Sequence, residues 1–187
     1  MKSEATRPSV AQPAPPASHS CPMFCCQTIV DLPGERRRLQ AARYGVIETS
    51  GGRLTAVHLR PWPTLFALRE LWPVGDRYHA PGPADRCRLY YNQPRGSSNF
   101  LAVKYIVSTK GTKYATFTAA LRVLDAIAEV KHTDAIVCDA ANSRLSDRLM
   151  QRQGWEPHAP MRWRRNFIRR FYGDYPGAWA VLASAAR

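Results

Sequence analysis

Hydrophobic and polar positions change their spacing in the second half of the chain, and the change predicts a strand, a helix and a second strand. Residues 99–107 are β-branched, aromatic and apolar, which is typical of a largely buried strand. After a polar loop, apolar residues recur every three or four positions from Phe117 to Ala128, as on one face of a helix. Residues 134–139 form an apolar run too short for a helix. Together these segments predict a parallel βαβ unit with a right-handed connection.

The first half of the chain predicts antiparallel strands and short helices. Strand-like runs occupy residues 44–49, 54–59 and 87–92. Gly51 and Gly52 separate the first two runs, and adjacent glycines are a hairpin signal because such a turn needs positive φ. Short helices are expected within residues 33–43 and at 64–72. The expected fold class is therefore α+β, a mixed sheet in which an antiparallel N-terminal meander joins the parallel βαβ unit.

Composition divides the chain into a tail and one domain. Residues 1–30 are dominated at their start by Ser, Ala, Pro, Gln and Thr, which cannot offset the conformational entropy of folding, so we expect a disordered tail. Residues 31–187 fit a single domain of ordinary size. No apolar run has the length of a signal sequence or of a membrane helix. We therefore expect a soluble, cytoplasmic protein without a membrane partner.

The five cysteines do not indicate a disulfide framework or a metal site. Their number is odd, and no secretory signal precedes them. Cys21, Cys25 and Cys26 cluster, but no second pair of cysteines or histidines follows at the spacing of zinc ligands. Cys87 and Cys138 lie inside predicted strands and are expected in the core.

The charge balance of 27 Lys and Arg against 14 Asp and Glu gives a net charge of +13, which attracts polyanions. One basic patch is Arg36–Arg38. A second interleaves arginines with aromatic residues near the end of the chain: Arg162, Arg164, Arg165, Arg169 and Arg170. The second patch has two interpretations, because alternation alone does not separate them. We favour a terminal strand that buries its aromatics and solvates its arginines over a surface for nucleic acid or an acidic partner.

The loop at residues 110–115 opens the long helix and is the first candidate for chemistry. Exposed amides at a helix start carry partial positive charge that suits phosphate oxygens, and Lys110 and Lys113 can add charge-assisted contacts. An ordinary strand-to-helix turn with hydrated lysines explains the same residues equally well.

A second turn follows the strand at residues 134–139. Asn142 or Ser143 can cap the helix that follows, and Gly154 supplies a left-handed end to it. For Asn142 itself, a capping role is the simplest explanation.

This order of elements resembles the GCN5-related N-acetyltransferase superfamily. Residues 142–156 are similar to a late signature of that family, in which an Asn precedes a helix that ends in Gly, an aromatic residue and Glu. The resemblance covers about residues 99–172. It implies a mixed sheet splayed between its central strands, with acetyl-coenzyme A in the splay and its pyrophosphate on the loop amides. The cofactor-binding residues implied in this way are Ile106, Val107, Ser108, Lys110, Gly111, Thr112, Lys113, Tyr114, Ala115 and Asn142.

The loop is degenerate with respect to the family pattern, because Lys113 stands where the family has its middle glycine and Met150 stands where many members have a proton-donating tyrosine. The resemblance implies acetyl transfer from acetyl-coenzyme A to an unidentified amine, and no catalytic residue is assigned. The alternative is an inactive protein of this fold that binds nucleic acid or an acidic partner through the second basic patch.

Overall fold

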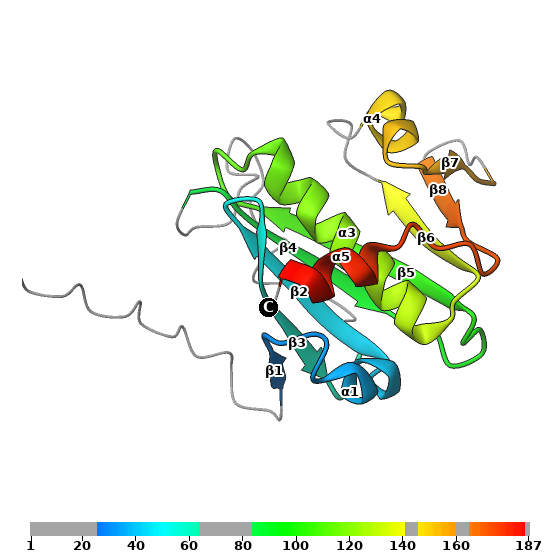
Figure 1. Cartoon of the computed structure of the whole chain (residues 1–187). Helices are drawn as coiled ribbons and strands as arrows, with labels where there is room; N and C mark the ends of the chain where they lie inside the picture. Colours follow the sequence, from blue (N-terminus) through cyan, green and yellow to red (C-terminus); the bar gives the residue numbers. More distant parts are fainter. Residues whose placement is uncertain (1–25, 64–83, 141–145, 160–164, 186–187) are drawn as a thin grey trace, which may run out of the picture.

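The structure, a computed structural model, describes residues 26–63, 84–140, 146–159 and 165–185 of the 187. One mixed sheet runs through it in the order β1-β3-β2-β4-β5-β6-β8-β7 (Figure 1). The strands are β1 (Gln27–Ile29), β2 (Tyr44–Ser50), β3 (Arg53–Arg60), β4 (Arg86–Asn92), β5 (Phe100–Ser108), β6 (Ala135–Ala140), β7 (Glu156–Pro157) and β8 (Arg165–Arg170). The helices are α1 (Arg36–Ala41), α3 (Tyr114–Lys131), α4 (Asp147–Arg152) and α5 (Ala178–Ala185).

The predicted fold class is confirmed. Strands β1 to β5 pair antiparallel, and β5 pairs parallel with β6 through the crossover helix α3. Beyond β6 the sheet returns to antiparallel pairing with β8 and β7. The meander and the βαβ unit therefore share β5, the strand that the apolar run at residues 99–107 predicted.

Helix α3 covers one face of the sheet, and α1 and α5 pack against α3 (Figure 1). Strand β2 shows how the residues are divided between the faces. Thr49 faces α3 and donates its hydroxyl hydrogen to the Thr116 carbonyl oxygen at 2.9 Å, whereas Glu48 lies on the opposite face. Gly45 also faces α3, where a Cβ atom would lie 2.6 Å from the hydroxyl oxygen of the fully buried Tyr91.

The C-terminal end of α3 holds the end of α1 through one buried lysine. The Lys131 ammonium group donates to the carbonyl oxygens of Gln40 at 3.0 Å and Ala42 at 2.6 Å. It also lies 3.2 Å from the side-chain oxygen of Gln93. Because the last carbonyls of a helix lack intrahelical donors, Lys131 satisfies groups that α1 leaves unpaired.

The boundary of the predicted tail is wrong at its C-terminal end. Gln27–Ile29 forms strand β1 against β3, and Ile29 is buried in the core with Leu32. These residues contribute large apolar side chains, unlike the Ser, Ala and Pro residues before them. Residues 1–25, and the helix predicted at 64–72, lie outside the described residues.

The start of helix α4 also differs from the prediction. The described helix begins at Asp147, and the Ser146 side chain accepts a hydrogen bond from the Leu149 amide as its cap. The predicted caps, Asn142 and Ser143, lie outside the described residues. The predicted left-handed end of this helix at Gly154 is confirmed, with φ of 76°.

Candidate functional site

The pairing between strands β5 and β6 ends about halfway along β5. The splay between the two strands beyond that point is the candidate site. Their parallel pairing covers four positions, from Phe100 with Ala135 to Val103 with Cys138. Strand β5 then continues to Ser108, paired only with β4 among the described strands. At the parting point Lys104 is an extra residue, because Tyr91 pairs with Val103 and Tyr90 with Tyr105. A bulge of this kind increases twist and bends the strand, which turns the second half of β5 away from β6.

The structure places the predicted β5 residues along the free half of that strand. Ile106 packs against the core, Val107 is half-buried, and Ser108 pairs with Cys87 at the strand end. The predicted loop residues follow directly, and Asn142 lies outside the described residues. The described residues that the resemblance implies for cofactor binding therefore lie on the second half of β5, on the loop after it and at the start of α3.

The loop after β5 is tied to the start of β4 by hydroxyl groups. The Thr109 amide donates to the Arg86 carbonyl oxygen, and the Arg86 amide donates to the Thr109 hydroxyl oxygen, each at 3.0 Å. The Thr112 hydroxyl donates to the Arg86 carbonyl oxygen at 2.9 Å. Gly111 adopts φ of 84° within this turn. These contacts fix the residues before β4 beside the first turn of α3.

A protein carboxylate sits on the first turn of α3. The Lys113 amide donates to the Asp85 carboxylate oxygen at 2.8 Å. Asp85 also forms a hydrogen bond with the Thr116 side chain, and this bond together with the Lys113 amide holds the pKa of Asp85 below its usual value. The Thr112 amide bonds the Thr109 carbonyl oxygen at 3.2 Å. Two amides of the predicted phosphate loop therefore already have protein acceptors.

A chain of contacts joins α4 to α3 on the β6 side of the splay. The Arg169 guanidinium group on β8 lies 3.1 Å from the buried Asp125 carboxylate on α3, and it donates to the Gln153 carbonyl oxygen. The Gln153 side chain in turn bonds the Tyr114 hydroxyl group at the start of α3. Burial raises the pKa of Asp125 to about 7, although the charge of Arg169 opposes the rise. No local sequence pattern predicts these contacts, since they join residues from 16 to 44 positions apart.

The sheet face opposite α3 carries a buried ionic cluster that the sequence did not indicate. The Glu48 carboxylate on β2 lies 2.5 Å from Arg86 and 3.1 Å from Arg88, both on β4. His58 on β3 lies 3.6 Å away and bonds Thr28 of β1 through its other ring nitrogen. The cluster therefore connects four strands. Because neighbouring cations neutralise the Glu48 carboxylate, it does not present a free base.

Two residues near the splay lack the chemistry of a catalytic acid or nucleophile. Met150, at the position of the family tyrosine, is 2% exposed and has no proton to give. Burial raises the pKa of the Cys138 thiol to about 12, so its reactive thiolate form is scarce at neutral pH.

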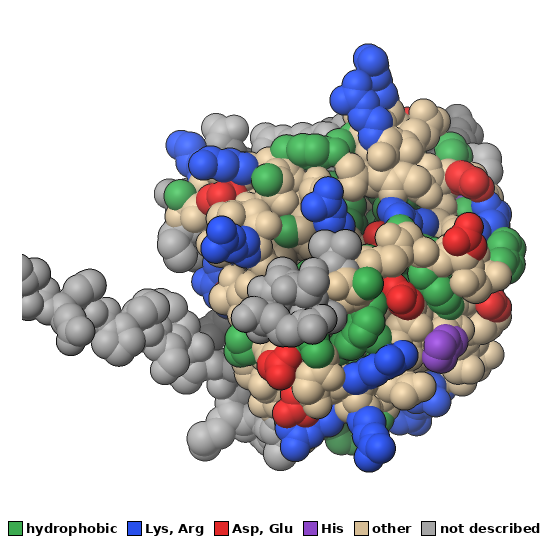
Figure 2. Space-filling model, viewed as in Figure 1, with side chains coloured by type: hydrophobic (Ala, Val, Ile, Leu, Met, Phe, Trp, Pro, Cys, Tyr) green, Lys and Arg blue, Asp and Glu red, His purple; other side chains and the backbone are tan. Residues whose placement is uncertain are grey.

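The described arginines of the second basic patch form ion pairs with carboxylates. Arg165 pairs with Asp147 at 2.9 Å, Arg169 with Asp125, and Arg170 with Glu156. Phe167 and Phe171 are buried, as predicted for a terminal strand, but the three arginines bind carboxylates instead of only water. Arg162 and Arg164 lie outside the described residues. Figure 2 shows Lys and Arg side chains spread over the visible face, with acidic side chains among them.

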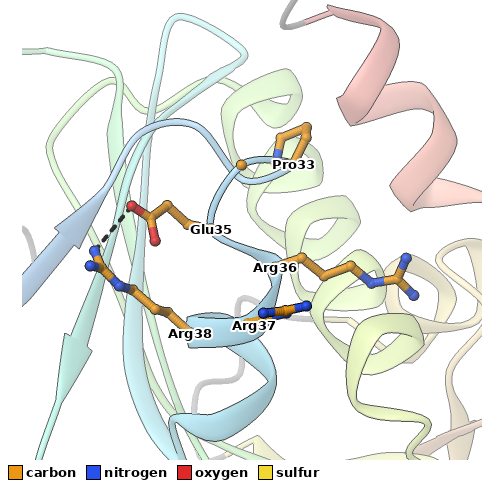
Figure 3. A pocket seen from close by; sticks show the side chains of 6 residues that line it. Pro33, Glu35, Arg36, Arg37 and Arg38 are labelled. Atoms are coloured by element: carbon orange, nitrogen blue, oxygen red, sulfur yellow. Dashed lines mark hydrogen bonds and ion pairs between the residues drawn. The ribbon is translucent and has the colours of Figure 1, made fainter.

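A hollow of about 520 Å³ lies away from the splay, beside α1. Its lining comes from one continuous segment, Pro33 to Arg38. Arg36 and Arg38 point in opposite directions, and Arg38 pairs with Glu35 at 3.0 Å (Figure 3). Because no groups from other elements converge there, the hollow lacks the arrangement of a binding site.

The described residues contain no group of three His, Cys, Asp or Glu side chains placed to hold a metal ion. Of the helices in the described ranges, none has the length and apolar character needed to cross a membrane.

Comparison with known proteins gives a likeness to a solved structure and none to a family or curated sequence. No protein-family model and no curated protein matches the sequence. The crystal structure of a nourseothricin acetyltransferase aligns over 79% of this chain and 99% of its own, with 12% identity and a TM-score of 0.38. A likeness of this size carries no argument about activity, so the case for a function depends on the geometry of the splay.

Proposed function

We propose that the protein binds an acyl-coenzyme A in the splay between β5 and β6 and transfers the acyl group to an amine. The observation that carries this proposal is that the parallel ladder ends at Val103 and Cys138 while β5 runs on to Ser108. The resemblance of residues 99–172 to N-acetyltransferases supports the same assignment. The identity of the amine is left open.

The edge of β5 beyond Val103, which pairs with no described strand on the side of β6, matches the chemistry of the coenzyme. The pantetheine arm of coenzyme A is an extended chain with two amide groups, which can pair with a strand edge as a peptide does. Lys104, at the bulge, is where the two strands separate and where a thioester at the end of that arm would lie. The arm would then run along the second half of β5 toward the loop at residues 109–113.

The positively charged loop residues supply the contacts for phosphate. Lys110 and Lys113 are exposed, and amides at the start of a helix such as α3 carry partial positive charge. Lys113 is the N-cap residue of α3 and has an extended backbone with φ of −78°, so its backbone does not require glycine. Its side chain, however, takes space that a glycine would leave to the ligand.

The chemistry proposed is direct attack by the amine on the thioester. The amine nitrogen bonds the carbonyl carbon, the carbon–sulfur bond breaks, and the thiolate leaves. Backbone amides at the bulge would stabilise the charge that develops on the carbonyl oxygen. Since Met150 cannot donate a proton, the thiolate would take its proton from solvent, and the proton lost by the amine would pass to solvent as well.

Calorimetric titration with coenzyme A and acetyl-coenzyme A tests the proposal. We expect saturable binding by the wild-type protein and tighter binding by Lys113→Gly, because the glycine opens space at the loop. Arg95→Gly is the matched control, since it removes the same charge from the exposed turn at the opposite end of β5. The absence of binding at millimolar coenzyme by all three proteins would refute the proposal.

A further inference from the structure

The first turn of α3 already holds an anion that belongs to the chain itself. The Asp85 carboxylate accepts from the Lys113 amide at 2.8 Å and bonds the Thr116 side chain. Thr116 is itself fixed, because its hydroxyl oxygen accepts from the Gly52 amide at 2.8 Å. The carboxylate thus sits where the resemblance places a phosphate of the cosubstrate.

The backbone aims Asp85 at this position. Asp85 adopts φ of 60°, a left-handed conformation that residues with a side chain seldom take. Its carbonyl oxygen accepts from the Gly51 amide at 3.3 Å, and the next residue, Arg86, is tied to Thr109. The hairpin between β2 and β3 and the loop after β5 therefore both help to hold Asp85 against α3.

A carboxylate and a phosphate cannot share these donors. The Lys113 amide has one hydrogen, and two anions close together repel each other. Asp85 is only half-buried at the end of its loop, so its side chain has solvent into which it can turn. Binding of a phosphate at this turn therefore requires that Asp85 move away first.

We propose that Asp85 is an internal competitor, an autoinhibitory contact whose carboxylate must leave the start of α3 before an acyl-coenzyme A can bind there. This inference rests on the proposed function, since it concerns the same site. It makes the affinity for the coenzyme depend on a residue that lies outside the loop and that the resemblance does not mark.

Titration of coenzyme A into wild type, Asp85→Asn and Asp174→Asn tests this inference. Asparagine removes the charge of Asp85 and keeps its size, and we expect the dissociation constant to fall about three- to tenfold, the range of a single hydrogen bond. Asp174 is the matched control: it is exposed, and its neighbour Tyr175 contacts Thr133 just beyond the far end of α3. Its replacement should change the constant less than about twofold, because salt screens a charge at that distance.

Two further measurements keep the test decisive. Asp85→Ser is measured in parallel in case Asp85→Asn does not fold, and thermal unfolding reports folding of each variant. The amide resonance of Lys113 should shift on addition of coenzyme A to the wild type, because its acceptor changes from carboxylate to phosphate.

The outcomes separate the two proposals. Tighter binding by the Asp85 variants, with the Asp174 variant near wild type, supports the competitor. Binding by wild type that is equal or stronger than binding by the folded Asp85 variants overturns the competitor and leaves the proposed function standing. No binding by any folded variant overturns both.

Discussion

Replacing Glu48 by glutamine tests how much the buried ionic cluster contributes to stability. The side chain is 10% exposed, and its carboxylate contacts Arg86, Arg88 and His58. Burial alone raises the pKa of Glu48, but the hydrogen bond with His58 and the charges of Arg88 and Arg86 outweigh it and lower the pKa from 4.5 to about 2. Since each pKa unit corresponds to about 1.4 kcal/mol, the ionised form contributes about 3 kcal/mol to the free energy of unfolding.

The sign of the pH dependence follows from this difference. A carboxyl group with a lower pKa in the folded state stabilises the protein above pH 4.5, and the stabilisation is lost as the pH falls toward 2. At pH 7 we expect Glu48→Gln to lower the free energy of unfolding by about 3 kcal/mol, the lower end of the cost of breaking a buried pair. Urea denaturation of both proteins at pH 7, 4 and 3 measures the two effects.

Glu156→Gln is the control, because Glu156 forms an exposed pair with Arg170 that should contribute less than about 1 kcal/mol. Equal losses in the two variants, or a Glu48→Gln protein whose stability falls with acid as steeply as wild type, would show that the cluster does not act as described.

Three further predictions concern packing and helix ends. Gly45→Ala should lower the free energy of unfolding by about 1–3 kcal/mol, because the added Cβ meets the buried Tyr91 ring. Gly96 has open space around it, so Gly96→Ala should change the free energy of unfolding by less than about 0.5 kcal/mol. Urea denaturation compares the two variants, and equal midpoints would contradict the packing argument. Lys131→Met should lower the free energy of unfolding by about 2 kcal/mol, because α1 loses the donor to its last carbonyl oxygens. Hydrogen exchange of the α1 amides should also become faster, and unchanged exchange rates would count against this role of Lys131. Ser146→Ala should lower the free energy of unfolding by about 1 kcal/mol, whereas Ser146→Asn should stay near wild type because asparagine can also cap a helix. An equal loss of stability in both variants would exclude the capping hydrogen bond as the cause.

Periodicity predicted the elements that carry the fold because burial of a strand or helix face leaves a local pattern in the sequence. The apolar run at residues 99–107, the helical spacing from Phe117 to Ala128 and the run at 134–139 correspond to β5, α3 and β6. The hairpin at Gly51-Gly52 is also present, with both glycines at positive φ. The order and direction of these strands followed from the topology rules for a crossover.

The contacts that define the candidate site left no such pattern. The end of the β5–β6 ladder coincides with the bulge at Lys104, which is set by the register between β4 and β5 and leaves no signal in the local spacing of apolar residues. Asp85 reaches Lys113 across 28 residues, and Arg169 reaches Asp125 across 44. The ion pairs of the arginines that we expected in solvent could therefore not be predicted from the sequence, because folding brings their carboxylate partners to them from distant positions.

The short ladder between β5 and β6 also divides the molecule mechanically. Four residue pairs, reinforced at one end by the bond between the Asn99 and Asp134 side chains at 2.8 Å, form the strand seam between the five-stranded half and the half with β6, β8 and β7. Helix α3 packs on the five-stranded half, and the ion pair between its Asp125 and Arg169 of β8 ties it to the smaller half. The seam has fewer residue pairs than the ladders on either side of it, β4–β5 and β6–β8, so small rotations about it would set the width of the splay.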